Sequence, residues 1–107
     1  MANPARGEVA FTVANTEYTL KFSTNAICEL EDRLNKSISV IVEGMDRITV
    51  VRAMLWAGLQ AKHPEMTLQD AGDIIDRGGM AHIAETISKA LTLAFPAQDE
   101  AKTKKKA

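Results

Sequence analysis

The segment Thr24-Asn-Ala-Ile-Cys-Glu-Leu-Glu-Asp-Arg-Leu-Asn-Lys-Ser-Ile38 holds one amphipathic helix and the exit from it. Ile27, Leu30 and Leu34 recur at intervals of three and four residues, so they share one side of a helix. We expect that helix to end at about Asn35. A helix with one apolar side must bury that side, so the neighbouring segments have to supply the rest of a core.

Polar residues at the start of this helix are suited to capping it, namely Ser23, Thr24 and Asn25. The single cysteine, Cys28, lies beside Ile27 near the edge of the apolar side. No histidine is close to it in sequence, so we predict a small buried side chain rather than a nucleophile. A lone cysteine cannot form an intramolecular disulfide, which is typical of a reducing cytosol.

Two segments that alternate between apolar and polar residues precede the helix. Residues 8–13 read Glu-Val-Ala-Phe-Thr-Val, and residues 17–22 read Glu-Tyr-Thr-Leu-Lys-Phe. Both are rich in β-branched and aromatic residues, and residues 14–16 between them include a turn-tolerant asparagine, so we predict a β-hairpin. Its apolar face comprises Val9, Phe11, Val13, Tyr18, Leu20 and Phe22. A two-stranded hairpin is marginal alone, so this face must lie on helices.

Three longer helices are predicted downstream. The first covers residues 47–62, with Asp46 as its cap and a stripe formed by Ile48, Val51, Leu55 and Leu59. The second covers residues 67–77 and opens on a capping box in which Asp70 stands in the place of the usual glutamate. After Gly78-Gly79, the third covers residues 80–94. The wide apolar arc of the first predicts that it is the central helix of the core.

Residues 36–44 are less decided, because Ile38, Val40, Ile41 and Val42 suit either a short helix or an extended piece. The expected fold class is α+β, with an N-terminal β-hairpin packed on a bundle of about four helices. We expect one domain over residues 8–96, preceded by a flexible N-terminus at 1–7. The lysine-rich residues 97–107 are expected to be a disordered tail.

Composition narrows the function classes. The chain has 107 residues and a formal net charge of −1, with 46% hydrophobic and 25% charged residues. A near-neutral protein has no global field that attracts nucleic acid or an anionic membrane, so neither is an expected partner. No apolar run approaches the roughly 18 residues of a membrane span, and the N-terminus lacks a signal-peptide core. We therefore expect a cytoplasmic protein.

The residues that usually carry chemistry do not form a recognisable constellation. His63 and His82 fall on different predicted elements, and His63 is expected to lie near the negative end of a helix dipole. Neither has a second ligand at metal spacing, so we expect no metal, no cofactor and no enzymatic activity. Two helices around Gly78-Gly79 resemble a helix-turn-helix, but the second offers Lys89 only late, so a small DNA-binding regulator is the weaker alternative.

Four apolar residues are candidates for partner binding: Ile38, Val40, Ile41 and Trp56. Each has two interpretations, as a core residue or as an anchor for a partner, since tryptophan is enriched at interface hot spots. The free edge of the hairpin is a further candidate, because it could pair with a second copy of the chain or with a strand of a client.

Four stretches together resemble the tail assembly chaperone family of phages and gene transfer agents. They are Asn3-Pro-Ala-Arg-Gly-Glu8, Phe22–Leu34, Arg52-Ala-Met-Leu-Trp-Ala-Gly-Leu59 and His63-Pro-Glu-Met-Thr-Leu-Gln-Asp-Ala-Gly72. The resemblance covers residues 3–95 and rests on their joint occurrence in order. The tail beyond Pro96 carries no match.

The resemblance implies a non-enzymatic role in building a phage-type tail inside the bacterial host cell. Such chaperones bind the tape measure protein, the tail tube protein or both, and keep apolar surface covered until the tube polymerises. The family label also includes tail tube proteins, so a structural tail component retained in the particle is the main alternative. A tube subunit usually has far more β-structure than two short strands, which favours the chaperone.

Overall fold

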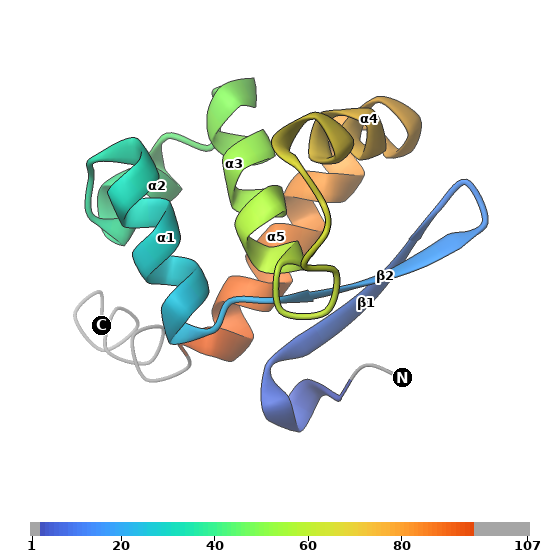
Figure 1. Ribbon diagram of the computed structural model, residues 1–107, viewed down its shortest axis with the longest axis horizontal. Helices are drawn as coiled ribbons and strands as arrows, with labels where there is room; N and C mark the ends of the chain where they lie inside the picture. Colours follow the sequence, from blue (N-terminus) through green and yellow to red (C-terminus); the bar gives the residue numbers. More distant parts are fainter. Residues whose placement is uncertain (1–2, 96–107) are drawn as a thin grey trace, which may run out of the picture.

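The computed structural model describes residues 3–95, in which a β-hairpin leads into five helices (Figure 1). The elements are η1 (Pro4–Arg6), β1 (Glu8–Val13), β2 (Thr16–Lys21), α1 (Thr24–Leu34), α2 (Ile38–Glu43), α3 (Ile48–Leu59), α4 (Leu68–Gly78) and α5 (Met80–Ala94). This arrangement confirms the predicted α+β fold. The predicted disordered tail at 97–107 lies outside the described residues.

The hairpin closes through a two-residue turn. Val13 pairs with Thr16, and between them Ala14 and Asn15 both have left-handed backbone, with φ of 51° and 67°. Positive φ at both central residues is the geometry of a type I′ turn, which matches the twist of the flanking strands. In an antiparallel ladder, every second residue of a strand exchanges backbone hydrogen bonds with the partner strand. The N–H and C=O groups of the residues in between point away from the partner strand.

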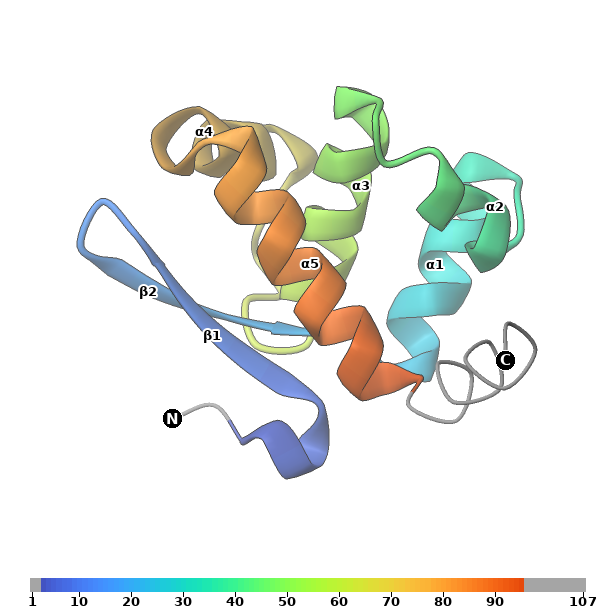
Figure 2. The ribbon, with the colours of Figure 1, turned by 180° about the vertical axis from the view of Figure 1, so that it is seen from behind.

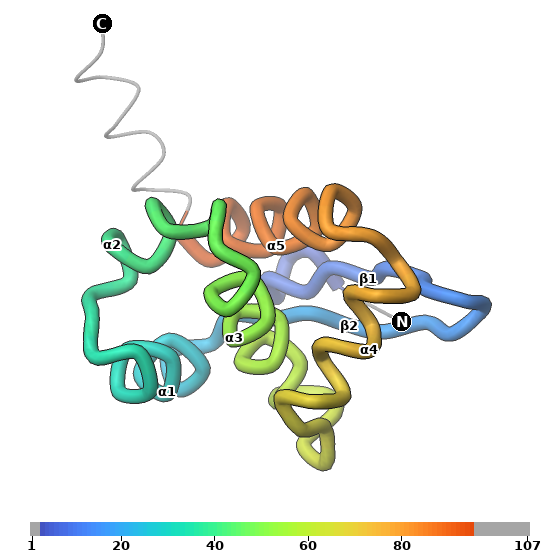
Figure 3. The backbone as a smooth tube through the Cα atoms, turned by 90° about the horizontal axis from the view of Figure 1, so that it is seen from above, coloured from blue at the N-terminus to red at the C-terminus, as the bar shows by residue number. Residues whose placement is uncertain are grey.

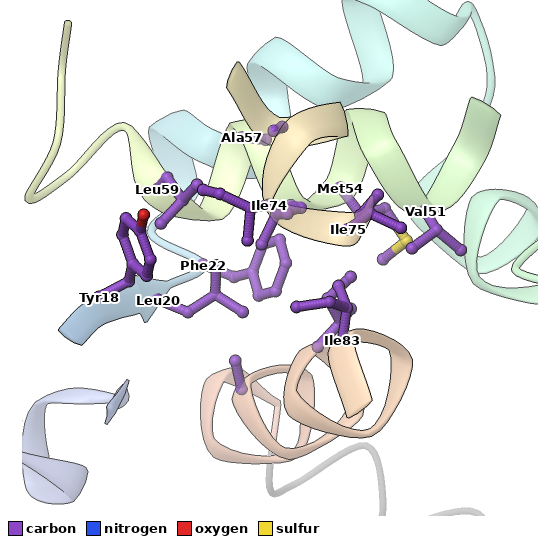
Figure 4. Close-up of a cluster of buried hydrophobic side chains, with 14 of the residues drawn as sticks. Tyr18, Leu20, Phe22, Val51, Met54, Ala57, Leu59, Ile74, Ile75 and Ile83 are labelled. Atoms are coloured by element: carbon purple, nitrogen blue, oxygen red, sulfur yellow. The ribbon is translucent and has the colours of Figure 1, made fainter. Parts of the chain in front are cut away.

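The core lies where the inner face of the hairpin meets α3, α4 and α5 (Figure 4). Helix α3 is central, because it packs against β2, α1, α4 and α5. Gly58 lets α3 approach the hairpin: a Cβ there would lie 2.6 Å from the Cδ1 atom of Leu20. The largest fully buried side chains are Leu20, Leu30, Ile41, Val51, Met54, Leu55, Leu59, Ile83 and Ile87.

The helix starts follow the predicted caps in two of three cases. Ser23 accepts a hydrogen bond from the Ala26 amide at the start of α1, and Thr67 and Asp70 form the predicted capping box of α4. The predicted Asp46 cap is wrong: the residue before α3 is Arg47, without a side-chain capping bond, and α3 ends at Leu59 rather than residue 62.

Residues 38–43 form the short helix α2, which decides between the two interpretations of this segment. β-branched residues have only a weak preference against helix, and burial outweighs it. Ile41 is 1% exposed, so one side chain of α2 is inserted into the core. Helix α2 packs mainly on α1 (Figure 1).

Helix α5 turns back from α4 at Gly79, whose φ of +88° belongs to the left-handed region that favours glycine. Seen from behind, α5 runs alongside β1, and the view from above shows β1 next to α5 as well (Figures 2 and 3). Where β1 and the second half of α5 are neighbours, residues of both elements line a groove.

Candidate partner-binding surfaces

The first surface is the α2–α3 corner, which we define as residues 38–48. Its two outward apolar side chains are Ile48, 62% exposed, and Val40, 47% exposed. They are two of the three large apolar side chains that the described chain exposes, so exposed apolar surface is concentrated in this short segment. Ile48 was expected on the buried stripe of α3, and that expectation is wrong because α3 begins there, at the rim of the core.

The corner is anchored to the rest of the fold by a hydrogen bond and by apolar side chains packed against the core. The amide of Ile38 donates a hydrogen bond to the Glu31 carboxylate on α1, with 2.8 Å between N and Oε2, and Ile41 fills the core below. Ile38 itself is half-buried. Of the predicted binding residues on α2, Val40 therefore presents surface, while Ile41 supports the helix from inside.

Trp56 lies apart from this corner, in the seam between α1 and α3. The Arg33 guanidinium stacks over its ring at 4.5 Å from the centroid, and the side chain is half-buried. This cation–π contact covers the ring and joins the two helices. The partner-binding role assigned to Trp56 and the α2 residues stays a prediction.

The second surface is the groove beside β1, with a volume of about 520 Å³. Its lining residues are Pro4, Glu8, Val9, Ala10, Lys89, Thr92 and Leu93. Leu93, at 37% exposed, is the third outward apolar side chain of the described chain. Sequence reasoning missed this groove, because it arises only where β1 and α5 come together across the whole chain.

Glu8 forms the polar end of the groove and is only 4% exposed. Its carboxylate accepts a hydrogen bond from the Asn3 amide at 2.9 Å and pairs with Lys62, with 3.3 Å between Oε2 and Nζ. The Asn3 hydrogen bond, helped by Lys62 and opposed by burial, lowers the pKa of Glu8. These contacts are structural, since they tie the N-terminal turn and the segment after α3 to the hairpin.

His63 follows the end of α3, as expected, and it also has a structural role that the sequence did not indicate. Its Nε2 atom accepts a hydrogen bond from the Thr19 amide at 3.1 Å, and its ring packs in a T-shaped arrangement with the ring of Tyr18. The predicted burial of Cys28 is wrong: the thiol lies on the exposed side of α1, where Ala26 and Leu30 take the buried positions. Within residues 3–95, no group of three or more His, Cys, Asp or Glu side chains could hold a metal ion.

None of the helices in the described part of the chain is long and apolar enough to cross a membrane. No curated protein and no solved structure matches the chain significantly. One family model does match it, over residues 6–96, and its description is phage tail tube protein, GTA-gp10. That span takes in the hairpin, helices α1 to α5 and the α2–α3 corner, so the chain belongs to this phage and gene transfer agent tail family.

Proposed function

We propose that the chain is a non-enzymatic tail assembly chaperone that binds the tape measure protein, the tail tube protein or both in the host cytoplasm. Its family membership supports a role connected with a tail. The observation that carries the binding role is the α2–α3 corner, where Val40 and Ile48 keep apolar side chains in water. Exposed apolar surface marks protein-binding sites when it is concentrated, and two of the three exposed large apolar side chains of residues 3–95 fall within this segment of the chain.

The corner suits reversible binding of an apolar segment. Val40 and Ile48 offer aliphatic contact, while Ile41 and the Glu31 bond hold α2 in place beneath them. A surface that is already ordered loses little conformational freedom on binding, which favours affinity. A client segment with its own apolar face would cover both side chains until tail assembly removes it.

The test is co-expression of the chain with the tape measure and tail tube proteins of the same phage or prophage, followed by size-exclusion chromatography. The double variant Val40→Lys/Ile48→Lys should lose the complex, because two buried apolar contacts become unpaired charges. The matched control is Thr49→Lys, which adds a charge beside Ile48 at an exposed position and removes no apolar contact. If the natural chain, the double variant and Thr49→Lys bind equally well, the client site lies elsewhere. If the natural chain forms no complex with the tape measure protein or with the tail tube protein, the chaperone role is contradicted.

The second candidate is a structural tail component retained in the particle. The description of the chain's family, phage tail tube protein, favours this role. Mass spectrometry of purified particles separates the two roles. A chaperone should be absent or far below the amount of the tube subunit, whereas a tail component should be present in a fixed ratio to it.

A further inference from the structure

The outer edge of β1 has backbone groups that β2 does not satisfy. Val13 and Thr16 close the turn and form a hydrogen-bonded pair, and such pairs occur at every second residue of β1. The N–H and C=O groups of Ala10 and Thr12, which lie between bonded pairs, therefore point away from β2. The outward amide of Glu8 donates to the Asn3 carbonyl at 3.1 Å. Within residues 3–95, no such bond meets the outward amides of Ala10 and Thr12. The free edge therefore runs over residues 9–13.

This edge lacks the usual devices that prevent pairing with another chain. Natural edge strands carry charges, proline or a bulge. Residues 9–13 read Val-Ala-Phe-Thr-Val and contain neither charge nor proline. The register to β2 is unbroken over all six residues of β1, so there is no bulge. On the opposite edge, His63 occupies the outward amide of Thr19.

Space for an added strand exists on the β1 side. The groove of about 520 Å³ borders Val9 and Ala10 at one end of the free stretch, and residues of α5 line its other side. Its lining is largely apolar, with Leu93 on that side. A strand entering the groove would gain backbone hydrogen bonds and cover this apolar lining, which is the mode of recognition called β-augmentation.

We propose that the occupant is the same edge of a second copy, paired antiparallel about a two-fold axis through Phe11. The Asn3 contact blocks the edge at Glu8, and the turn ends it after Val13, so Phe11 is the midpoint of the free stretch. In this register Ala10 lies opposite Thr12 of the second copy, and Thr12 opposite its Ala10. Both outward donors of each copy then find carbonyl acceptors, giving four hydrogen bonds across the axis.

The charges of the hairpin agree with this pairing. The residues that meet across the axis are uncharged, so no like charges are opposed. On the same outer face, Glu17 lies near the turn and Lys21 lies at the other end of β2. In the paired sheet each β2 lies outside its own β1, so the two β2 strands are about 14 Å apart and these charges neither attract nor repel across the axis appreciably. A net charge of −1 adds little repulsion between copies.

The product would be a four-stranded antiparallel sheet built from two hairpins that are each marginal alone. The contact is short compared with standard interfaces, which bury about 800 Å² per partner. We therefore expect a reversible dimer whose population rises with concentration.

Sedimentation velocity over a concentration series tests the dimer. The weight-average mass should rise from that of the 11.6 kDa chain towards twice that value. Ala10→Pro should remain monomeric, because proline removes the outward amide but no bond to β2. Ala10→Ser keeps the amide and should behave like the natural chain. Circular dichroism melting verifies that Ala10→Pro is folded.

Cysteine cross-linking tests the register without relying on the proline variant. In a Cys28→Ser background, Ala10→Cys and Thr12→Cys are made separately, oxidised alone and oxidised as a mixture. Opposed residues in a bonded pair have Cα atoms about 5.5 Å apart, within disulfide range. The mixture should link rapidly, and each variant alone should not, because identical positions are offset along the strand. The proposal is overturned if disulfides form no faster in the mixture than in either variant alone. It is also overturned if sedimentation velocity shows a monomer at every concentration.

Discussion

His63 joins two parts of the chain that are far apart in sequence, because its Nε2 atom accepts a hydrogen bond from the Thr19 amide at 3.1 Å. The Thr19 amide points away from β1 and is part-buried. A donor in that position needs a partner, and the segment after α3 supplies one. The hairpin is thereby fastened to the end of the central helix.

Replacing His63 by alanine should lower the free energy of unfolding by about 1–3 kcal/mol, because the Thr19 amide loses its acceptor and the Tyr18 ring loses its neighbour. Urea denaturation followed by circular dichroism measures the change. His63→Gln is the control, since its amide oxygen can still accept a hydrogen bond. If both variants unfold at the same urea concentration as the natural chain, the bond contributes nothing to stability.

Gly58 and Gly72 should respond in opposite ways to the same substitution. Gly58→Ala puts a methyl group 2.6 Å from Leu20 Cδ1 and 2.9 Å from Leu20 Cγ, so overpacking should cost about 1–3 kcal/mol. Gly72→Ala on α4 meets only the flexible Arg52 side chain, at 3.4 Å, and should gain about 0.5–1 kcal/mol from helix propensity. Thermal melting of the two variants in one buffer gives the comparison. A gain at both positions would contradict the close packing of α3 on β2.

Glu8 makes stability depend on pH in the acid range. Its contacts lower its pKa below the ordinary value of 4.5, so the charged form stabilises the folded state above that value. This contribution should disappear as the pH falls from 4.5 through the pKa of the folded protein. Glu8→Gln should therefore be less stable than the natural chain at pH 7, and the difference should shrink in acid.

Urea midpoints measured between pH 7 and pH 3 check this dependence on Glu8. The control is Glu17→Gln, which removes a carboxylate from the exposed side of the same hairpin. A stability difference for Glu8→Gln that stays constant across the series would mean that the Asn3 and Lys62 contacts do not depend on the charge.

The sequence predicted the elements better than it predicted the surfaces. Alternation and helical spacing identified the hairpin and the helices, because each pattern is local and follows from which side is buried. The errors at Cys28 and Ile48 concern residues at the edge of an apolar stripe, where exposure depends on the neighbouring elements. The burial of Glu8 requires Asn3 and Lys62 to meet it, and nothing local to residue 8 signals this.

The contact between Arg33 and Trp56 offers a last test, on the seam between α1 and α3. A double-mutant cycle with Arg33→Ala and Trp56→Leu should give a coupling energy of about 0.5–1 kcal/mol, as expected for a partly exposed cation–π pair. The chain has a single tryptophan, so the fluorescence of the natural protein and of Arg33→Ala also reports directly on this seam. Removing the guanidinium should expose the ring to water and shift its emission to longer wavelength. Additive stability changes and an unmoved emission maximum would mean that Arg33 does not cover the ring in solution, which would leave Trp56 open to a partner.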